Sequence, residues 1–276
     1  MLEIEVVHLV WKPAGIEPFR EFLRSYREYP AGVDHGLVVL FNGFRGDDLG
    51  EHRALLSGIP HRELRVPRPV RDIEAYFWGA RNAEGRFLCF LNSYSSVLAA
   101  GWLRTLHENV TQPGVAAAGA TGSWESFYTS YKLRMAEVGQ PRSPIGWVKH
   151  LNRVRKLRRY RANFSPAPNP HLRSNAFMIE RSRWLALVPG SLRTKWSTWL
   201  FESGKRGLTP QLTAQGLEVV VVGRDGRGYT RDQWPQSGTF RNGEQANLLI
   251  ADNRTRQYAE AADVARSHMS RIAWGE

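Results

Sequence analysis

The chain has 276 residues, of which 42% are hydrophobic and 11% aromatic, enough to bury a substantial core. Its formal net charge of +12 favours an anionic partner, such as nucleic acid, phosphates, acidic glycans or lipid headgroups. No apolar run reaches the roughly 18 residues of a membrane span, and residues 1–5 do not resemble a signal peptide, so we expect a cytoplasmic protein. The single cysteine, Cys89, excludes a disulfide framework and a Cys-rich metal site, and we expect it to be buried in a strand.

The first half of the chain alternates predicted strands and helices. Strands are predicted at 3–11, 36–41, 61–66, 86–91 and 115–120, and helices at 16–29, 51–57, 72–81 and 98–108. The segment 36–41 is almost uniformly apolar, as expected of a parallel strand covered on both faces. The alternation predicts an α/β fold with a doubly wound, mostly parallel central sheet flanked by helices.

The second half is less regular. Residues 131–161 are rich in Lys and Arg and precede the Pro-rich stretch 165–170, which favours a mobile insertion. Beyond it we predict strands at 175–179 and 217–222, helices at 196–204 and 208–216, and a largely helical tail at 245–269.

Polar or aromatic residues follow several of the predicted strands. Ligands of parallel sheets bind beyond the carboxyl ends of the strands. We therefore expect Trp11, Asn42 and the tripeptide Asn92-Ser93-Tyr94 to converge on one crevice.

The segment 80–95, with Ala-Arg-Asn before an apolar strand that ends in Asn92-Ser93-Tyr94, resembles the central part of glycosyltransferase family 2. That family typically has A-R-N-x-G and then an apolar strand ending in L-D-S-D-D. Segments 101–103, 114–123 and 199–204 resemble its following helix, its next strand and loop, and its E-D-x-x-L segment. As an ordered set, the resemblance covers roughly residues 1–225.

The resemblance implies a GT-A fold, a Rossmann-like nucleotide-diphospho-sugar transferase fold, and transfer of a sugar from a nucleotide donor to an acceptor hydroxyl. It implies a single domain over 1–276, with a nucleotide-binding half at about 1–125 and an acceptor-side half at about 126–276. A UDP-sugar is the favoured donor. Nucleotide-sugar-binding residues carried over by position are Trp11 and Asn42 near the base, Asp72 and Arg81 near base and diphosphate, and Asn92, Ser93 and Tyr94 near ribose and phosphate.

The tripeptide Asn92-Ser93-Tyr94 departs from the family pattern where carboxylates would hold a divalent cation against the diphosphate. An amide, a hydroxyl and a phenol are poor ligands for magnesium or manganese. Either another carboxylate supplies the metal site or cationic side chains replace the metal, and we favour the second, with little or no metal dependence. The cationic candidates are Arg153, Arg155, Lys156, Arg158, Arg159 and Arg173. The alternative for the basic segment is a solvated face, or one that docks on an anionic acceptor.

An inverting transfer needs a general base, and the first candidate is Glu202, which matches the acidic residue of the family's segment. Ser203 follows it where the family often has Asp. The second candidate is Glu125, and a retaining mechanism would need neither as base. Ordinary surface carboxylates are the alternative for both.

On the acceptor side, aromatic side chains are candidates for stacking on a sugar, and small or polar residues for binding it. These candidates are Trp124, Tyr128 and Trp147 for stacking, and Gly122 and the triplet Arg173-Ser174-Asn175 for binding. The acceptor expected from the charge is a glycan, a lipid-linked glycan or nucleic acid.

Motifs of other α/β enzyme classes, including the P-loop and the Gly-x-Ser-x-Gly elbow, do not occur in the sequence. Three hypotheses stand: a glycosyltransferase acting on a glycan or lipid-linked glycan, a bacteriophage-type glycosyltransferase acting on modified DNA bases, and an inactive GT-A relative that serves as a binding module. The second would follow if the basic segment lay along a phosphate backbone.

Overall fold

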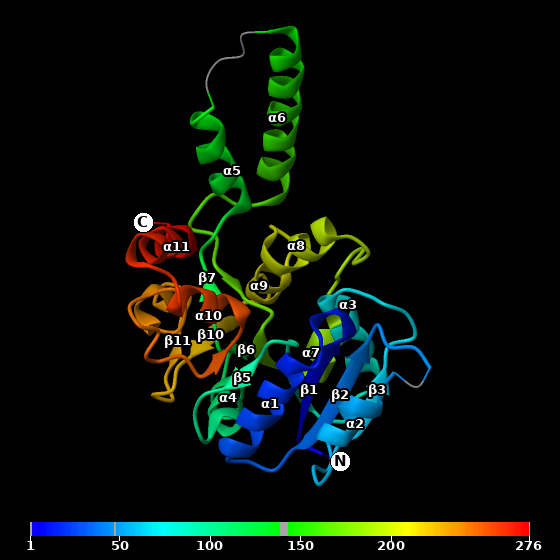
Figure 1. Cartoon of the computed structure of the whole chain (residues 1–276). Coiled ribbons are helices and arrows are strands. Elements are labelled where there is room, and N and C mark those ends of the chain that lie inside the picture. The colour runs from blue at the N-terminus through cyan, green and yellow to red at the C-terminus, as the bar shows by residue number, and fades with distance from the viewer. Residues whose placement is uncertain (1, 47, 139–142, 276) are drawn as a thin grey trace.

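The computed structural model of the chain describes residues 2–46, 48–138 and 143–275. A central sheet carries helices on both faces, and one pair of helices projects from this body (Figure 1). Within the described residues, no helix has both the length and the apolarity that crossing a bilayer requires.

The main sheet has eight strands in the order β11-β10-β6-β9-β4-β1-β2-β3. The strands are β1 (Ile4–Trp11), β2 (Gly36–Asn42), β3 (Arg62–Arg65), β4 (Phe87–Leu91), β6 (Val115–Gly119), β9 (Ala176–Glu180), β10 (Glu218–Val222) and β11 (Gly228–Tyr229). The pairs β1–β2, β1–β4, β2–β3 and β6–β10 are parallel, whereas β9 runs antiparallel between β4 and β6, and β11 is antiparallel to β10. The predicted α/β fold with a mostly parallel sheet is confirmed.

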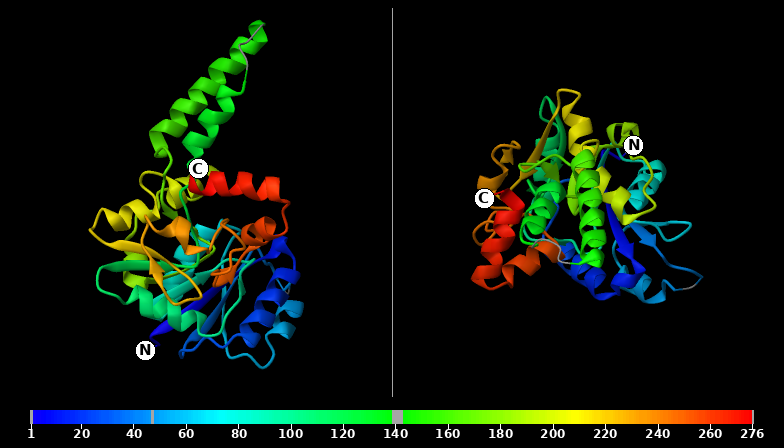
Figure 2. Two further views of the ribbon diagram at one scale, coloured as in Figure 1. Left: turned by 90° about the vertical axis from the view of Figure 1, so that its left-hand side faces the viewer. Right: turned by 90° about the horizontal axis from the view of Figure 1, so that it is seen from above.

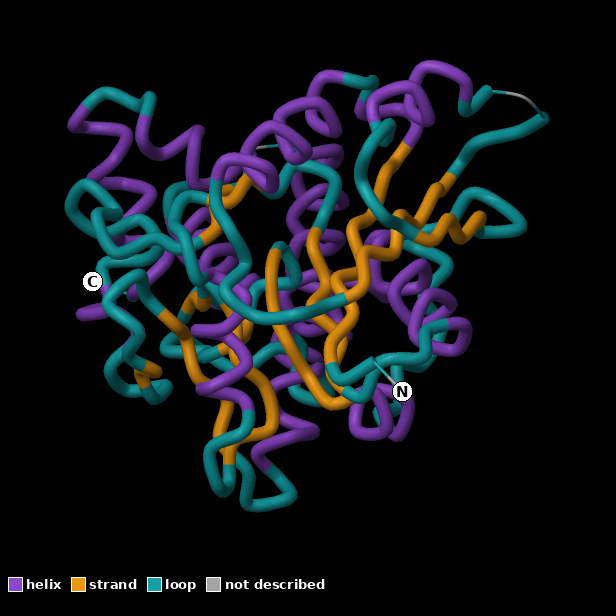
Figure 3. The backbone as a smooth tube through the Cα atoms, turned by 90° about the horizontal axis from the view of Figure 1, so that it is seen from below, coloured by secondary structure: helices purple, strands orange, loops and turns teal. Residues whose placement is uncertain are grey.

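Helices cover both faces of this sheet (Figure 3). One layer contains α1 (Glu17–Glu28), α2 (Gly50–Leu55) and α4 (Trp102–Val110); the other contains α3 (Asp72–Asn82), α7 (Arg181–Ala186), α8 (Lys195–Ser203) and α9 (Leu208–Thr213). Alternate residues of β1 enter different cores: Val6 joins the core with Phe22 of α1, and Val7 joins the core with Phe77 of α3. This two-sided burial explains why β4 is apolar throughout, Cys89 included.

Two small sheets complete the edge of the body. β5 (Ser96–Val97) pairs with β12 (Ile250–Ala251), and β7 (Gly122–Ser123) pairs with β8 (His171–Leu172). The first pair brings the C-terminal segment, with α10 (Asn253–Ala259) and α11 (Asp263–Trp274), over the end of β4. The predicted helical tail is therefore two helices preceded by a strand.

The helix predicted at 98–108 begins later, at Trp102. Gly101, directly before it, adopts a left-handed φ of 73°. This conformation cannot be part of a right-handed helix, so the helix starts after it. Two short 3-10 helices, η1 (Lys12–Ala14) and η2 (Trp234–Ser237), lie in loops.

The basic segment forms a helical hairpin, which we call the arm, made of α5 (Phe127–Ala136) and α6 (Pro144–Asn163). It projects from the body in Figure 1 and in the left-hand view of Figure 2. Ser126 and Ser143 cap the two helices, each accepting a hydrogen bond from a backbone N–H of the first turn. Near the base, the Tyr131 and Tyr160 rings stack at 5.1 Å. A sequence rich in Arg and Lys thus forms two helices here, and the mobility expected of this insertion stays a prediction.

Candidate active site

A cleft of about 590 Å³ lies at the carboxyl ends of the parallel strands. It contains residues from both predicted halves of the chain. Seven residues singled out from the sequence line it: Asp72, Asn92, Glu125, Arg173, Ser174, Asn175 and Glu202. The antiparallel direction of β9 is what brings 173–175 here, because the start of β9 lies beside the end of β4, where the Asn92 N–H donates to the Asn175 carbonyl at 2.8 Å.

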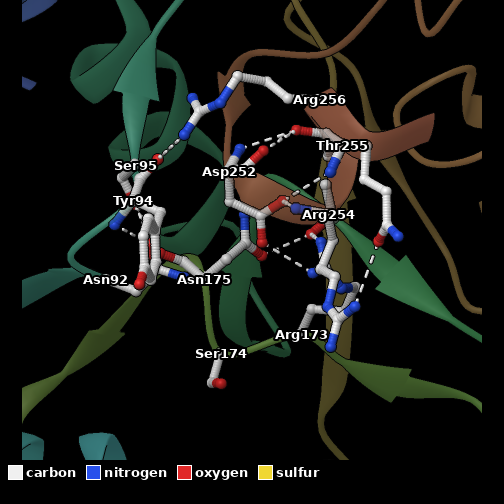
Figure 4. Close-up of polar contacts among 12 residues, drawn as sticks. Asn92, Tyr94, Ser95, Arg173, Ser174, Asn175, Asp252, Arg254, Thr255 and Arg256 are labelled. Carbon is white, nitrogen blue, oxygen red and sulfur yellow. Dashed lines mark hydrogen bonds and ion pairs between the residues drawn. The ribbon is translucent and has the colours of Figure 1, made fainter. Parts of the chain in front are cut away.

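The tripeptide Asn92-Ser93-Tyr94 closes the end of β4 (Figure 4). The Asn92 Oδ1 accepts hydrogen bonds from the Tyr94 N–H at 2.9 Å and the Ser95 hydroxyl at 3.1 Å. The Ser93 hydroxyl accepts one from the Trp11 N–H at 3.1 Å. These oxygens are engaged within the protein and include no carboxylate, so this tripeptide does not fit a divalent cation. Across the described residues, no cluster of three or more His, Cys, Asp or Glu side chains could hold a metal ion.

Positively charged side chains also line the cleft, among them Arg173 and Arg241. The Arg173 guanidinium lies 4.2 Å from the centre of the Phe240 ring, and the Arg241 guanidinium lies 5.0 Å from the same ring. Arg173 is paired with Asp252, whereas Arg241 has no ion-pair partner in the described part of the chain, and its Nε is buried without an acceptor. Burial, followed by the nearby charge of Arg173, lowers the pKa of Arg241. Arg241 therefore presents a partly desolvated charge to the cleft, with no ion-pair partner among the described residues although Glu125 and Asp252 are close enough to favour its charged form.

Three carboxylates of the cleft have raised pKa values. Burial raises the pKa of Glu202, and the negative charge of Asp72 adds to the effect, while the Ser174 hydroxyl, which donates a hydrogen bond to Glu202 Oε1, opposes it. Asp72, in the first turn of α3, is accessible from the cleft, yet desolvation by the surrounding protein raises its pKa as well. Desolvation also raises the pKa of Glu125, against the opposing charge of Arg241. A raised pKa makes a carboxylate a better proton acceptor.

Asn175 supplies a further polar group. Its side chain is 2% exposed, and its Oδ1 accepts a hydrogen bond from the Thr121 hydroxyl at 2.6 Å. The amide Nδ2 has no acceptor among the described residues. A buried donor without a partner is costly, so a ligand acceptor in the cleft would relieve it.

Two residues that we expected near the nucleotide, Asn42 and Trp11, lie outside the lining of the cleft. Asn42 is fully buried, and its amide pairs with both the N–H and the carbonyl of Val70, at 3.1 and 2.8 Å. It fixes the loop that leads to Asp72 and does not line the cleft. Trp11 ends β1 and is 38% exposed, beside Asn42 in the β1–β2 register as expected, but outside the lining of the cleft.

The prediction that Arg81 lies near the diphosphate is not supported. Arg81 is in the last turn of α3, whereas Asp72 is in its first turn. A helix that connects two parallel strands runs back across the sheet, so its two ends lie at opposite edges. Arg81 is about 14 Å along the helix axis from Asp72, which lines the cleft.

The predicted basic and aromatic candidates of the acceptor half also lie elsewhere. Arg153, Arg155 and Lys156 are on α6 of the arm and do not line the cleft. Trp124 donates its indole N–H to the Arg231 carbonyl at 2.9 Å and packs against Trp274, so it belongs to the body. Tyr128 and Trp147 are on the arm and form no platform with it; Trp147 is 52% exposed.

Several lining residues were not anticipated from the sequence. They are Lys195, Trp199, Phe240, Arg241, Asp252 and Arg254, among others. Phe240, Arg241, Asp252 and Arg254 come from the segment that the β5–β12 pairing places over the site. No motif marks that segment, although its Asp252 before a helix is a recognisable cap.

Solved structures that resemble the chain are glycosyltransferases. One is the mannosyltransferase PcManGT from Pyrobaculum calidifontis in complex with GDP-Man and Mn²⁺, with 13% identity and a TM-score of 0.41 over 66% of this chain and 45% of that one. Another is glucosyl-3-phosphoglycerate synthase from Mycobacterium tuberculosis in complex with Mn²⁺, UDP and glucosyl-3-phosphoglycerate, with 21% identity and a TM-score of 0.39 over 72% and 63%. A third is S. aureus TarS 1–349, with 12% identity and a TM-score of 0.35 over 42% and 34%.

The chain thus spans less than two thirds of the length of each of these proteins. No protein-family model and no curated protein sequence matches the chain.

Proposed function

We propose that the chain is a GT-A-like glycosyltransferase that moves a sugar from a nucleotide-sugar donor, a UDP-sugar by preference, to an acceptor hydroxyl in this cleft. The observation that carries the proposal is the meeting of desolvated carboxylates, Glu202 and Glu125, with the unpaired guanidinium of Arg241 at the carboxyl edge of the sheet. The volume of about 590 Å³ is within the range of pockets for ligands of this size.

The leaving nucleoside diphosphate needs positive charge or hydrogen-bond donors as the bond to the sugar breaks. Arg173, Arg241 and the free amide of Asn175 are donors at one wall of the cleft. A charge in a partly desolvated site interacts more strongly than one in water. In this proposal these three groups stabilise the leaving diphosphate. Arg173 was a candidate for that role together with Arg153, Arg155 and Lys156, which lie on the arm. Little or no divalent metal is then required.

For an inverting transfer, Glu202 is the proposed general base. The acceptor oxygen forms a bond to the anomeric carbon, the bond from that carbon to the diphosphate oxygen breaks, and the acceptor proton passes to the Glu202 carboxylate. The Ser174 hydroxyl orients that carboxylate, and Glu125 is the second candidate. The acceptor is proposed to be anionic, because Arg254 and Lys195 add positive charge to the lining of the cleft. A cytoplasmic location remains our prediction.

Thermal-shift measurements with UDP-, GDP-, dTDP- and CMP-sugars, each in EDTA, test the proposal. We expect stabilisation by a UDP-sugar in EDTA, and the Arg241→Gln variant should lose most of it. Stabilisation by none of these donors, with or without added Mn²⁺, would overturn the proposal and favour a binding module.

A further inference from the structure

The arm carries most of the bare apolar surface of the described chain. Ten large hydrophobic side chains are exposed in the described part of the chain. Six of them are on the arm: Leu133, Val138, Ile145, Trp147, Val148 and Leu151. The four on α6 are each more than half exposed, between 52% and 69%. Isolated exposed hydrophobic residues are ordinary, but a cluster at the end of a projecting hairpin marks an interaction surface.

The apolar residues of α6 lie on its outward side. At 100° per residue, Trp147, Val148 and Leu151 fall within one arc of about 100°, with Ile145 next to it. The opposite side of the helix contains Leu157 and the buried Tyr160, which faces α5 through the Tyr131 ring. Nothing within the described residues covers the outward apolar arc.

Basic residues succeed the apolar ones along the same outward side. Arg155 and Arg158 continue the arc toward the base of the arm, about one and two turns after Leu151. Arg159, next to Arg158, packs on the Trp196 ring of α8, 4.0 Å from its centre. The described arm residues, 127–138 and 143–163, contain nine Lys or Arg and one acidic residue, Glu137. The surface is therefore apolar at the distal end and strongly basic behind it.

We propose that the arm is a membrane anchor that inserts its distal apolar residues into the interface of an anionic bilayer. A segment of this kind lies at the boundary of headgroups and acyl chains, with its Lys and Arg side chains on the anionic headgroups. A tryptophan beside the basic residues fits the interfacial layer, where its ring is half apolar and half polar. A nucleic-acid backbone would use the basic residues but leave the six apolar side chains without a partner.

The arm is joined directly to the cleft. The chain enters the arm after Glu125, and it returns through the Pro-rich stretch to Arg173, and both residues line the cleft. Since α6 has 20 residues, it is about 30 Å long, so an anchored tip would hold the cleft at a set height above the bilayer. Membrane binding itself does not depend on the proposed transfer reaction.

Co-sedimentation with vesicles tests the anchor. The full chain should bind vesicles of phosphatidylglycerol and phosphatidylcholine and show little binding to phosphatidylcholine alone. The variant Trp147→Ser/Val148→Ser/Leu151→Ser should lose most of this binding, and Arg155→Glu/Arg158→Glu should weaken it by roughly 25-fold or more, from about fivefold per basic residue removed. The control Val188→Ser/Val264→Ser removes two apolar residues of the body that are even more exposed, and should bind as the unmodified chain does.

A fluorescent label provides a second readout. Cys89 is fully buried, so a cysteine introduced as Val148→Cys can be labelled selectively with an environment-sensitive dye. Its emission should shift to the blue on anionic vesicles, and a label at Val264→Cys should not shift.

Absence of vesicle binding by the full chain would overturn the anchor, as would binding that the arm variants leave unchanged. Two further results would reassign the arm: arm-dependent retention of duplex DNA without vesicle binding, and arm-dependent dimerisation in size-exclusion chromatography without vesicle binding. Donor-induced thermal stabilisation is measured on the same variants and should be unchanged, so failure of the anchor and failure of the proposed enzyme activity are distinguishable.

Discussion

The guanidinium of Arg173 lies 2.8 Å from the carboxylate of Asp252, and both side chains are largely withdrawn from solvent. Asp252 also accepts hydrogen bonds from the N–H groups of Arg254 and Thr255 at the start of α10. Burial alone would raise the pKa of Asp252, but Arg173 and these N–H donors outweigh it and hold the pKa below its usual value. The pair joins the start of β9 to α10 and fixes the arginine wall of the cleft (Figure 4).

Replacing Asp252→Asn should lower the free energy of unfolding at pH 7 by about 3–5 kcal/mol, because it leaves the Arg173 charge buried without its partner. Urea denaturation measures the loss. The control Asp263→Asn, at an exposed first turn of α11, should cost less than about 1 kcal/mol. Equal losses for the two variants would contradict the role of the pair.

The pH dependence of this pair has a definite sign. A carboxylate whose folded pKa is depressed contributes stability above its unfolded pKa, and that contribution is lost as the pH falls through the folded value. The difference between the unmodified chain and Asp252→Asn should therefore narrow only below about pH 4. A difference that already vanishes at pH 6 would contradict this assignment.

Glu202→Gln should reduce the rate of sugar transfer by roughly 10²–10⁴-fold, because the amide cannot accept the acceptor proton. Gln can still accept the hydrogen bond from Ser174, so donor-induced thermal stabilisation should persist. Steady-state rates over a range of donor concentrations separate the two effects. The matched control is Glu260→Gln on the surface beside α10, and if Glu202→Gln were as active as that control, Glu125 would be the next residue to test.

Arg241→Gln should weaken the use of the donor by about 10–150-fold, the loss expected when a charge-assisted hydrogen bond of about 1.5–3 kcal/mol is removed. The arm residue Arg155 is the matched control, because Arg155→Gln removes the same charge outside the cleft. Donor concentration dependence in a transfer assay gives the comparison. An equal effect of both variants would mean that net charge, and not the cleft, governs donor binding.

His8 should make the fold sensitive to mild acid. Its ring is fully buried in β1, stacked 3.6 Å from the Phe22 ring, with no hydrogen-bond partner among the described residues. Burial lowers its pKa to about 3. Below about pH 6.5 the unfolded chain takes up a proton at His8 that the folded chain does not, so this residue alone lowers the free energy of unfolding by about 2 kcal/mol between pH 7 and pH 5.

The His8→Phe variant should make that acid-dependent loss smaller by about 2 kcal/mol, whatever its effect on stability at pH 7. The remaining loss is expected from His171, whose pKa burial lowers to about 4. Urea denaturation at pH 7 and pH 5 gives the two values for each protein. His268→Gln, at an exposed position of α11, should retain the loss. If His8→Phe retained it too, other groups would be responsible for the acid sensitivity.

The sheet and its edge could be predicted because the signals are local. The apolar strands and the short loops between them predict a parallel sheet, and the carboxyl ends of such strands form the ligand edge. Asp72, Asn92, Arg173, Asn175, Glu125 and Glu202 meet there as those rules require.

The other residues of the cleft depend on strand pairing between distant segments, which the sequence does not reveal. Arg241 and Asp252 reach the cleft because two residues of β12 pair with β5, about 150 positions earlier in the chain. The basic residues of α6 are misassigned to the site for a related reason: charge density alone cannot distinguish a cleft wall from a projecting helix. Arg81 could have been excluded from the direction in which α3 must run.

The most direct test of the central claim is donor turnover in the absence of free metal. The rate of UDP release from a UDP-sugar, with a suitable acceptor, is measured in excess EDTA and again with Mn²⁺, for the unmodified chain and for Arg241→Gln. We expect similar rates for the unmodified chain under both conditions and a large loss of rate for Arg241→Gln. Turnover that requires Mn²⁺ and is indifferent to Arg241→Gln would contradict the claim.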